Sequence, residues 1–136
     1  MLIAAGVMAL LLPFLFQSRP TVTLKSGGRE YKLEVVATPE SRQKGLSGRP
    51  DMPDDRGMIF VFDEPAVQCI WMKDMRFSLD IAWLDGEKRI THIEQAVSPD
   101  TYPRQFCPSE PARYVVELNA GEAERAGLKA GQTLAL

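Results

Sequence analysis

The amino-acid sequence predicts a mainly β fold, a compact barrel or sandwich of seven to eight short strands with one or two short helices. Apolar and polar residues alternate with a period of two in several short stretches, which is the signature of a strand. Turn sequences rich in glycine and proline separate these stretches. The chain has 136 residues, which is the length of one domain. Many short strands separated by turns are typical of a barrel or a sandwich.

The N-terminal residues are predicted to form a targeting segment. Leu2–Phe16 carries no charge, and as a helix it would extend about 22 Å, short of the roughly 30 Å hydrocarbon core of a bilayer. This length suits the apolar region of a secretory signal, although no Lys or Arg precedes it and no A-x-A cleavage site follows. An uncleaved membrane anchor, a start-site artefact and a core helix are the alternatives. We expect a signal peptide or anchor plus linker over residues 1–20 and a single β-rich domain over residues 21–136.

The domain is predicted to begin with a β-hairpin. Thr21–Lys25 alternates polar and apolar residues, Gly27 and Gly28 supply a turn, and residues 31–35 form the second strand. The apolar run Met58–Phe62 is typical of a strand buried on both faces. The remaining predicted strands are Gln68–Met72, Leu79–Trp83, Arg89–Glu94, Tyr114–Leu118 and Thr133–Leu136.

Two short helices are predicted from their capping residues. Thr38 is a suitable N-cap, Pro39 suits the first helical position, and Gly45 can end the helix. Asn119 is the predicted N-cap of a second helix over Gly121–Ala126. Both helices are too short to change the fold class.

Composition excludes several classes of function. Sixteen basic and eighteen acidic residues give a net charge of −2, so nucleic acid is not expected as the main partner. One histidine and two cysteines cannot form a four-ligand Cys/His zinc site, and no glycine-rich phosphate loop is present. We therefore predict no metal and no cofactor. Whether the protein is an enzyme stays open, since the sequence holds no known catalytic motif.

Five short segments, taken together in their order along the chain, resemble a known protein family, although no single segment is specific to it. They are Gly45-Leu46 with Arg49, Gly57-Met58-Ile59-Phe60, Trp71-Met72-Lys73, Leu79-Asp80 and Pro111 to Leu118. In this order and spacing they resemble the domain-of-unknown-function 192 family, over about Val22 to Leu136. The resemblance implies a compact, mostly β domain, often behind an export signal in bacteria, and it implies no established reaction. The sequence departs from it at Asp74 and Met75, where members often carry Asn and Thr.

The two cysteines, Cys69 and Cys107, are predicted to form a disulfide. An even count suggests pairing in an exported protein, and similar members of the family often carry cysteine at both positions. Such a bond would contribute about 4 kcal/mol in the chain-entropy model. Two buried thiols are one alternative. A nucleophilic thiol is another, and it would need His92, the only histidine, as its base.

Five residues of the family-like segments form the predicted ligand site. If residues 68–72 are a strand, Trp71 and Lys73 point the same way, and an indole beside a cation is a platform for a flat or sugar-like ligand. Arg49 and Arg113 can grip an anion, and Asp80 is the nearby acid. The alternative for Trp71 and Lys73 is a structural cover with the lysine reaching to solvent.

Glu117 is predicted to form a structural ion pair with Arg113. It lies between Val116 and Leu118 in an apolar strand, where a carboxylate faces solvent or finds a cationic partner. Such a pair would connect a loop to the sheet. The alternative is an anion site in which the arginines hold a ligand.

Three hypotheses for the function follow. The first is an exported, periplasmic or secreted binding module for a small polar or anionic ligand, such as a saccharide or an envelope component. The module would contact the membrane only through an uncleaved N-terminal segment. The second is an enzyme of unknown reaction in which Asp74 or Asp80 acts with Lys73 as acid and base. The third is a structural or interaction domain without a ligand.

Overall fold

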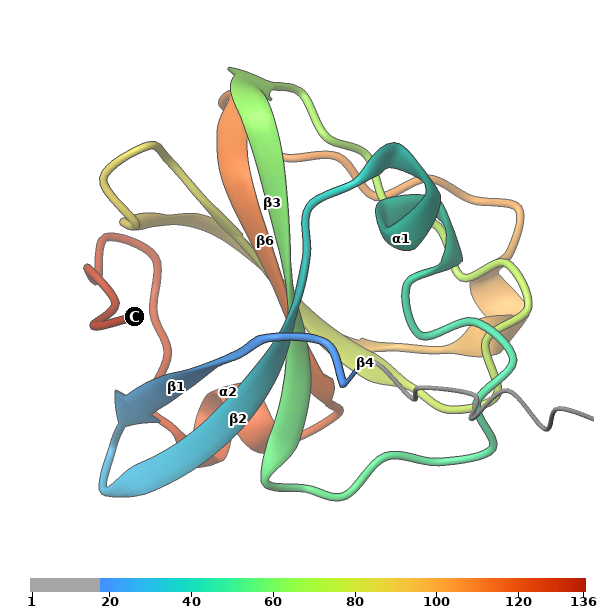
Figure 1. The fold of residues 1–136 in the computed structure, drawn as a ribbon, viewed down its shortest axis with the longest axis horizontal. Helices are drawn as coiled ribbons and strands as arrows, with labels where there is room; N and C mark the ends of the chain where they lie inside the picture. Colours follow the sequence, from blue (N-terminus) through green and yellow to red (C-terminus); the bar gives the residue numbers. More distant parts are fainter. Residues whose placement is uncertain (1–17) are drawn as a thin grey trace, which may run out of the picture.

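The computed structural model describes residues 18–136, and the predicted signal or anchor lies largely outside this range. Six strands form one sheet, and two short α-helices and a 3-10 helix connect them (Figure 1). The elements in chain order are β1 (Thr21–Ser26), β2 (Arg29–Val36), α1 (Pro39–Lys44), β3 (Arg56–Ala66), β4 (Leu79–Leu84), β5 (Ile90–Val97), the 3-10 helix Pro99–Thr101, β6 (Ala112–Asn119) and α2 (Glu122–Arg125). The prediction of a mainly β fold is confirmed.

The strands are ordered β1-β2-β3-β6-β4-β5 across the sheet. All neighbours are antiparallel except β2 and β3, which run parallel. A parallel neighbour requires a long crossover, and here the crossover carries α1 and the loop after it. The sheet is strongly twisted and is not closed into a barrel (Figure 1).

Two of the predicted strands are single bridges instead of ladders. In Gln68–Met72 only Ile70 pairs, with Phe106, and in Thr133–Leu136 only Thr133 pairs, with Arg89. In the first, the Gln68 carbonyl accepts a hydrogen bond from the buried indole of Trp83, 2.6 Å away. Because that backbone group bonds a core side chain, it is not free to extend a strand ladder.

Each face of the sheet carries its own hydrophobic cluster. Strand β6 shows the division, since Val116 and Leu118 belong to one cluster and Val115 to the other. The cluster beside Val115 is completed by residues from the crossover and from the connections on that face, including Leu46, Met52, Met72 and Phe106. Glu117 lies two residues from Val115, so its side chain is on this second face.

The helix caps agree with prediction at α1 and differ at α2. Thr38 caps α1 in a capping box with Ser41, and Gly45 follows the last turn. At α2, Gly121 is the N-cap residue, whereas Asn119 donates its side-chain amide to the carbonyl of Met52. The prediction of Asn119 as the cap is therefore wrong, because the loop before β3 lies beside it.

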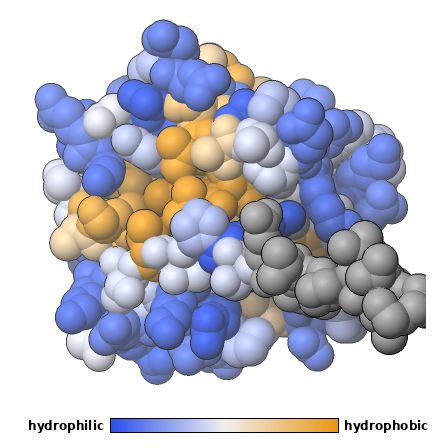
Figure 2. Space-filling model, viewed as in Figure 1, coloured by the Kyte–Doolittle hydropathy of each residue, from blue (hydrophilic) through white to orange (hydrophobic). Residues whose placement is uncertain are grey.

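One face of the molecule has an apolar area with polar residues around it (Figure 2). The face in Figure 2 has hydrophobic residues at its centre and hydrophilic residues around them. Across residues 18–136, no helix is long and apolar enough to cross a membrane. The predicted linker of the N-terminal segment ends at Pro20, whose carbonyl accepts a hydrogen bond from the Val35 amide at 2.8 Å.

Candidate functional site

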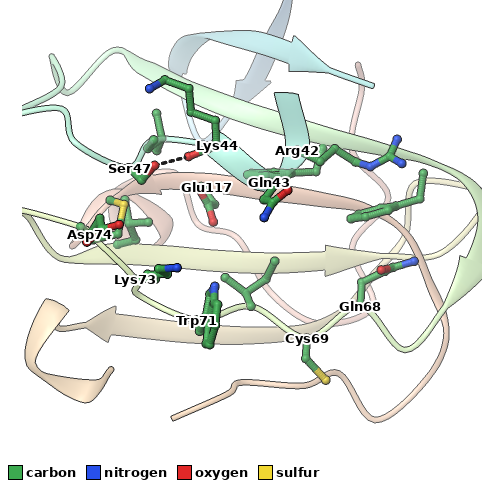
Figure 3. Close-up of a pocket in the computed structure, with 17 residues that line it drawn as sticks. Arg42, Gln43, Lys44, Ser47, Gln68, Cys69, Trp71, Lys73, Asp74 and Glu117 are labelled. Atoms are coloured by element: carbon green, nitrogen blue, oxygen red, sulfur yellow. Dashed lines mark hydrogen bonds between the residues drawn. The ribbon is translucent and has the colours of Figure 1, made fainter. Parts of the chain in front are cut away.

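A pocket of about 360 Å³ lies on the face of the sheet that carries α1. This volume is in the range of small-ligand sites. One wall comes from α1 and the turn after it, the opposite wall from the segment between β3 and β4, and the floor from β3, β4 and β6 (Figure 3). The polar residues that line it are Arg42, Gln43, Lys44, Ser47, Gln68, Trp71, Lys73, Asp74 and Glu117.

The first wall is set by a tight contact between α1 and the floor. Gly45 ends the helix with φ of +48°, and a Cβ there would lie 3.1 Å from the ring of Phe60. Only glycine adopts this backbone without strain and leaves room for the ring. The Arg42 guanidinium donates to the carbonyls of Ala37 and Val61 at 2.6 and 3.0 Å. Ala37 precedes the helix and Val61 lies on β3, so these bonds hold α1 against the sheet.

The second wall is attached to the loop before β6 by a disulfide between Cys69 and Cys107. The predicted pairing is confirmed. Beside it, Ile70 and Phe106 exchange two backbone hydrogen bonds of 2.8 Å. Three connections, the disulfide, this bridge and the Trp83 indole, therefore hold a segment without regular secondary structure against the sheet.

Glu117 is the buried acid on the floor of the pocket. Its side chain is surrounded by apolar neighbours, since Met58 and Ile81 are its partners on the strands at either side and both are fully buried. Among residues 18–136, no hydrogen bond or ion pair reaches its carboxyl group. Burial disfavours the charged form and raises the pKa of Glu117 to about 8. At neutral pH this carboxyl group is mainly protonated.

Trp71 and Lys73 form an exposed platform at the edge of the pocket. The Lys73 ammonium lies 5.7 Å from the centre of the Trp71 ring, and the ring of Tyr102 lies 5.3 Å from it on another side. Trp71 is 45% exposed and Tyr102 is 43% exposed, so both rings present apolar surface to solvent. The predicted neighbourhood of Trp71 and Lys73 is thus present, although the segment is not a strand.

The remaining polar side chains divide into those that face the pocket and those at its rim. Figure 3 shows the ends of Gln43 and Lys73 directed toward the middle of the pocket. The ends of Lys44 and Arg42 extend away from it. Arg42, Lys44 and Lys73 are cationic, and Asp74 is the one acid besides Glu117.

The two arginines of the predicted site lie elsewhere. Arg49 forms a fork with Glu34 on β2, with nitrogen–oxygen distances of 2.9 and 2.8 Å. The hydrogen bond from Arg49 lowers the pKa of Glu34 below its usual value. Arg113 donates to the carbonyl of Phe62, and its guanidinium lies 5.7 Å from the ring centre of Tyr114. Neither arginine lines the pocket.

Asp80 has a structural role on the other face of the sheet. One carboxylate oxygen accepts from the Ala96 amide at 2.8 Å, and the other accepts from the amides of Gly121 and Ala123 at 2.9 Å each. The side chain therefore supplies, from β4, the N-terminal cap that α2 lacks in its own sequence. With its oxygens occupied and 2% of its surface exposed, Asp80 does not contact the pocket.

The predicted ion pair between Glu117 and Arg113 is not formed. The two residues lie four apart on β6 and so point to the same face, but Arg113 bonds the β3 backbone near the end of the sheet. Glu117 is the residue whose role the sequence reasoning missed. An acid without charged neighbours in the apolar run Val115–Leu118 was the available signal.

Metal ligands do not gather in the described part of the chain. Across residues 18–136, no three His, Cys, Asp or Glu side chains are placed to hold a metal ion. His92 instead bonds Glu94, at 3.0 Å, and lies 5.3 Å from the Trp83 ring.

Comparison with known proteins assigns the family and leaves the activity open. The DUF192 family model, described as "Uncharacterized ACR", matches residues 22–136. A crystal structure from Sinorhizobium meliloti 1021, provisionally described as a transcription regulator, is 33% identical with a TM-score of 0.75, covering 85% of this chain and 91% of that one. A protein of unknown function from Novosphingobium aromaticivorans DSM 12444 is 28% identical with a TM-score of 0.78, covering 85% and 84%. No curated protein matches. Because the family model spans nearly the whole described chain, this protein belongs to the DUF192 family.

Proposed function

We propose that the protein is a binding module for a small polar or anionic ligand, held in the pocket between α1 and the disulfide-linked wall. The observation that carries the proposal is the buried carboxyl group of Glu117, which faces a pocket and has no partner in residues 18–136. Glu117 lines the pocket, so its carboxyl group is placed to form a hydrogen bond with a ligand bound there.

The lining favours a ligand with a ring and an acidic group. Trp71 lines the pocket and Tyr102 lies beside it, and their apolar ring faces suit a flat group or the face of a sugar ring. Lys73 lies next to the Trp71 ring and directs its ammonium toward the pocket. A ligand stacked on Trp71 would therefore place a carboxylate or phosphate within reach of a cation.

We further propose that the domain works in an exported location. The support is the disulfide between Cys69 and Cys107, since disulfides persist mainly in oxidising compartments. Both cysteines are exposed, so a reducing environment would have access to the bond. The mature N-terminus tests this proposal: mass spectrometry of protein from the native cell should place it near residues 17–21, or retain Met1 if the segment is an anchor. Recovery of the protein from the cytosol with both thiols free would contradict export.

The experiment for the binding function is a titration monitored by NMR and by tryptophan fluorescence. Glucose, N-acetylglucosamine, glucuronate and glucose 6-phosphate form the panel, and the oxidised full-length chain is the sample. We expect at least one acidic sugar to shift the amide signals of residues 43–47 and 69–75. The Trp71→Phe variant should lose the fluorescence change, because Trp83, the other tryptophan, is fully buried.

The other hypotheses predict different results in the same titration. An enzyme that uses Lys73 and Asp74 would convert a bound compound, and new ligand signals would appear over time. A structural domain would bind none of the panel. A short DNA duplex belongs in the panel because the S. meliloti relative is provisionally described as a transcription regulator. The net charge of −2 favours no binding to it.

A further inference from the structure

We propose that the pocket selects a small acidic sugar by two contacts: the protonated carboxyl group of Glu117 donates a hydrogen bond to a hydroxyl or carbonyl oxygen of the ligand, while Lys73 holds its acid group. This inference rests on the proposed binding function and adds the chemistry of the ligand and the state of the acid. It predicts that binding is coupled to a proton.

The groups around Glu117 explain why its acid form is the one available to a ligand. The neighbouring strands β3 and β4 present Met58 and Ile81 to it, neither of which can stabilise a charge. The other titratable and charged groups that line the pocket are Arg42 and Lys44 from α1, and Lys73 and Asp74 from the opposite wall. None of them forms an ion pair or a hydrogen bond with Glu117 in residues 18–136.

A protonated carboxyl group at the floor favours a neutral acceptor at that end of the ligand. Placing a ligand anion there would transfer a charge into surroundings formed by buried apolar side chains, which is costly. A ligand cation would find a carboxylate only after the acid loses its proton. It would also meet the cationic side chains of Lys73, Lys44 and Arg42 on the way in. A hydroxyl or carbonyl oxygen avoids both costs.

The acid group of the ligand belongs at the outer end of the pocket. Lys73 is exposed, and its ammonium lies over the Trp71 ring at 5.7 Å from the ring centre. An anion at this position stays partly hydrated while it contacts the ammonium. The Arg42 guanidinium already donates to two backbone carbonyls, and the end of Lys44 extends away from the pocket (Figure 3). Lys73 is the lining cation whose end is directed toward a ligand.

Calorimetric titration with glucuronate and with glucose tests the inference on the full-length chain. At pH 6 the wild type should bind glucuronate more tightly than glucose, and Lys73→Ala should remove most of this difference. Between pH 6 and pH 9.5 the wild-type affinity for glucuronate should fall about tenfold or more, because the donor proton is lost as Glu117 ionises.

Three variants separate the acid from other causes. Glu117→Gln keeps a hydrogen-bond donor that does not titrate, so its affinity should stay near the pH 6 wild-type value at both pH values. Glu117→Leu keeps an apolar floor without a donor, and its affinity at pH 6 should fall about tenfold. Glu110→Gln changes an exposed acid outside the pocket and should behave as the wild type. Thermal melts confirm that each variant is folded.

Each result has one meaning. Glucuronate binding that is independent of pH and unchanged in Glu117→Leu overturns the inference while the binding function stands. An affinity that rises with pH shows that Glu117 binds as a carboxylate, which also overturns it. Equal affinity for glucose and glucuronate rejects the acidic ligand. If no compound of the panel binds, the binding function fails together with the inference.

Discussion

At the scale of single residues, the position of Glu117 is the feature that distinguishes this domain from a plain β scaffold. A glutamate with 4% of its surface exposed, between a buried methionine and a buried isoleucine, lowers stability whenever it is ionised. This buried acid lies where the sheet borders a pocket of ligand size. Residues kept in spite of such a cost are concentrated at functional sites.

This cost predicts a pH dependence of stability. In the unfolded chain Glu117 titrates near 4.5, whereas in the folded protein its pKa is about 8. The folded state therefore binds more protons between these values, and the free energy of unfolding should fall as pH rises through them. Glu117→Gln should remove this fall and be more stable than the wild type at pH 9, by roughly 2–4 kcal/mol.

Urea unfolding at pH 5 and pH 9 measures the effect. The matched control is Glu110→Gln, since Glu110 is exposed and its removal should leave the pH profile of the wild type unchanged. Equal pH profiles for the wild type and Glu117→Gln would show that Glu117 is ionised or paired in the folded protein.

At the scale of elements, contacts from residues distant in sequence stabilise two short segments, the helix α2 and the pocket wall that carries Trp71. Helix α2 has four residues and no side-chain cap of its own, and Asp80 on β4 supplies the acceptors. The wall that carries Trp71 has no ladder, and a disulfide with one backbone bridge holds it. Both short elements depend on contacts that form only after the sheet does.

The cap from β4 to α2 can be tested by substitution at Asp80. Asp80→Ala leaves three backbone amides without their acceptor, and we expect a loss of about 2–4 kcal/mol in the free energy of unfolding. Asp80→Asn retains one oxygen and should lose less. Chemical denaturation at pH 7 gives both values. Ligand binding by the folded Asp80→Asn variant should match that of the wild type. A large loss of affinity would show that Asp80 takes part in ligand binding.

The disulfide wall gives a second prediction at this scale. The double variant Cys69→Ser, Cys107→Ser should lose about 2–4 kcal/mol of stability, because the unfolded chain is no longer constrained. Its fold should persist, since the cysteines lie outside both hydrophobic clusters. Urea unfolding of the variant and of the wild type under reducing conditions should agree. No change in either sample would show that the bond is not formed in solution.

At the scale of the molecule, one sheet covered on both faces defines the domain. Two hydrophobic clusters, one on each face, share the strands β2, β3, β4, β5 and β6. The pocket opens on the face where the cover is a short helix and long connections instead of strands. Loops on a rigid sheet are a common location for binding, because the sheet holds them in place.

This architecture predicts that residues 18–136 fold without the preceding segment. Both clusters lie within this range, and the first backbone contact of the sheet, from Val35 to Pro20, is retained. A chain that begins at residue 18 should melt at the temperature of the full-length protein, as measured by circular dichroism. A chain that begins at residue 27 loses β1 with the buried Leu24 and should not fold. A large drop in melting temperature for the first truncation would contradict a self-contained domain.

By itself, the sequence determined the features that depend on neighbouring residues. The alternation of side chains located five strands that take part in the sheet and the Met58–Phe62 core of a sixth, and Thr38, Pro39 and Gly45 located α1. The cysteine count and the family resemblance led to the disulfide. These features follow from local geometry and from chemistry that few residues can perform.

Only the tertiary structure decided which side chains meet. Arg49 bonds Glu34 on β2, Arg113 bonds the backbone of β3, and Asp80 bonds amides at the start of α2. The sequence prediction had placed all three residues at the ligand site. Within residues 18–136, Glu117 has no hydrogen-bond or ion-pair partner and lies on the floor of the pocket. The physical reason is that a charged side chain bonds the polar groups that lie within a few ångströms of it. The order of the strands decides which groups those are, and this order depends on residues distant in the sequence.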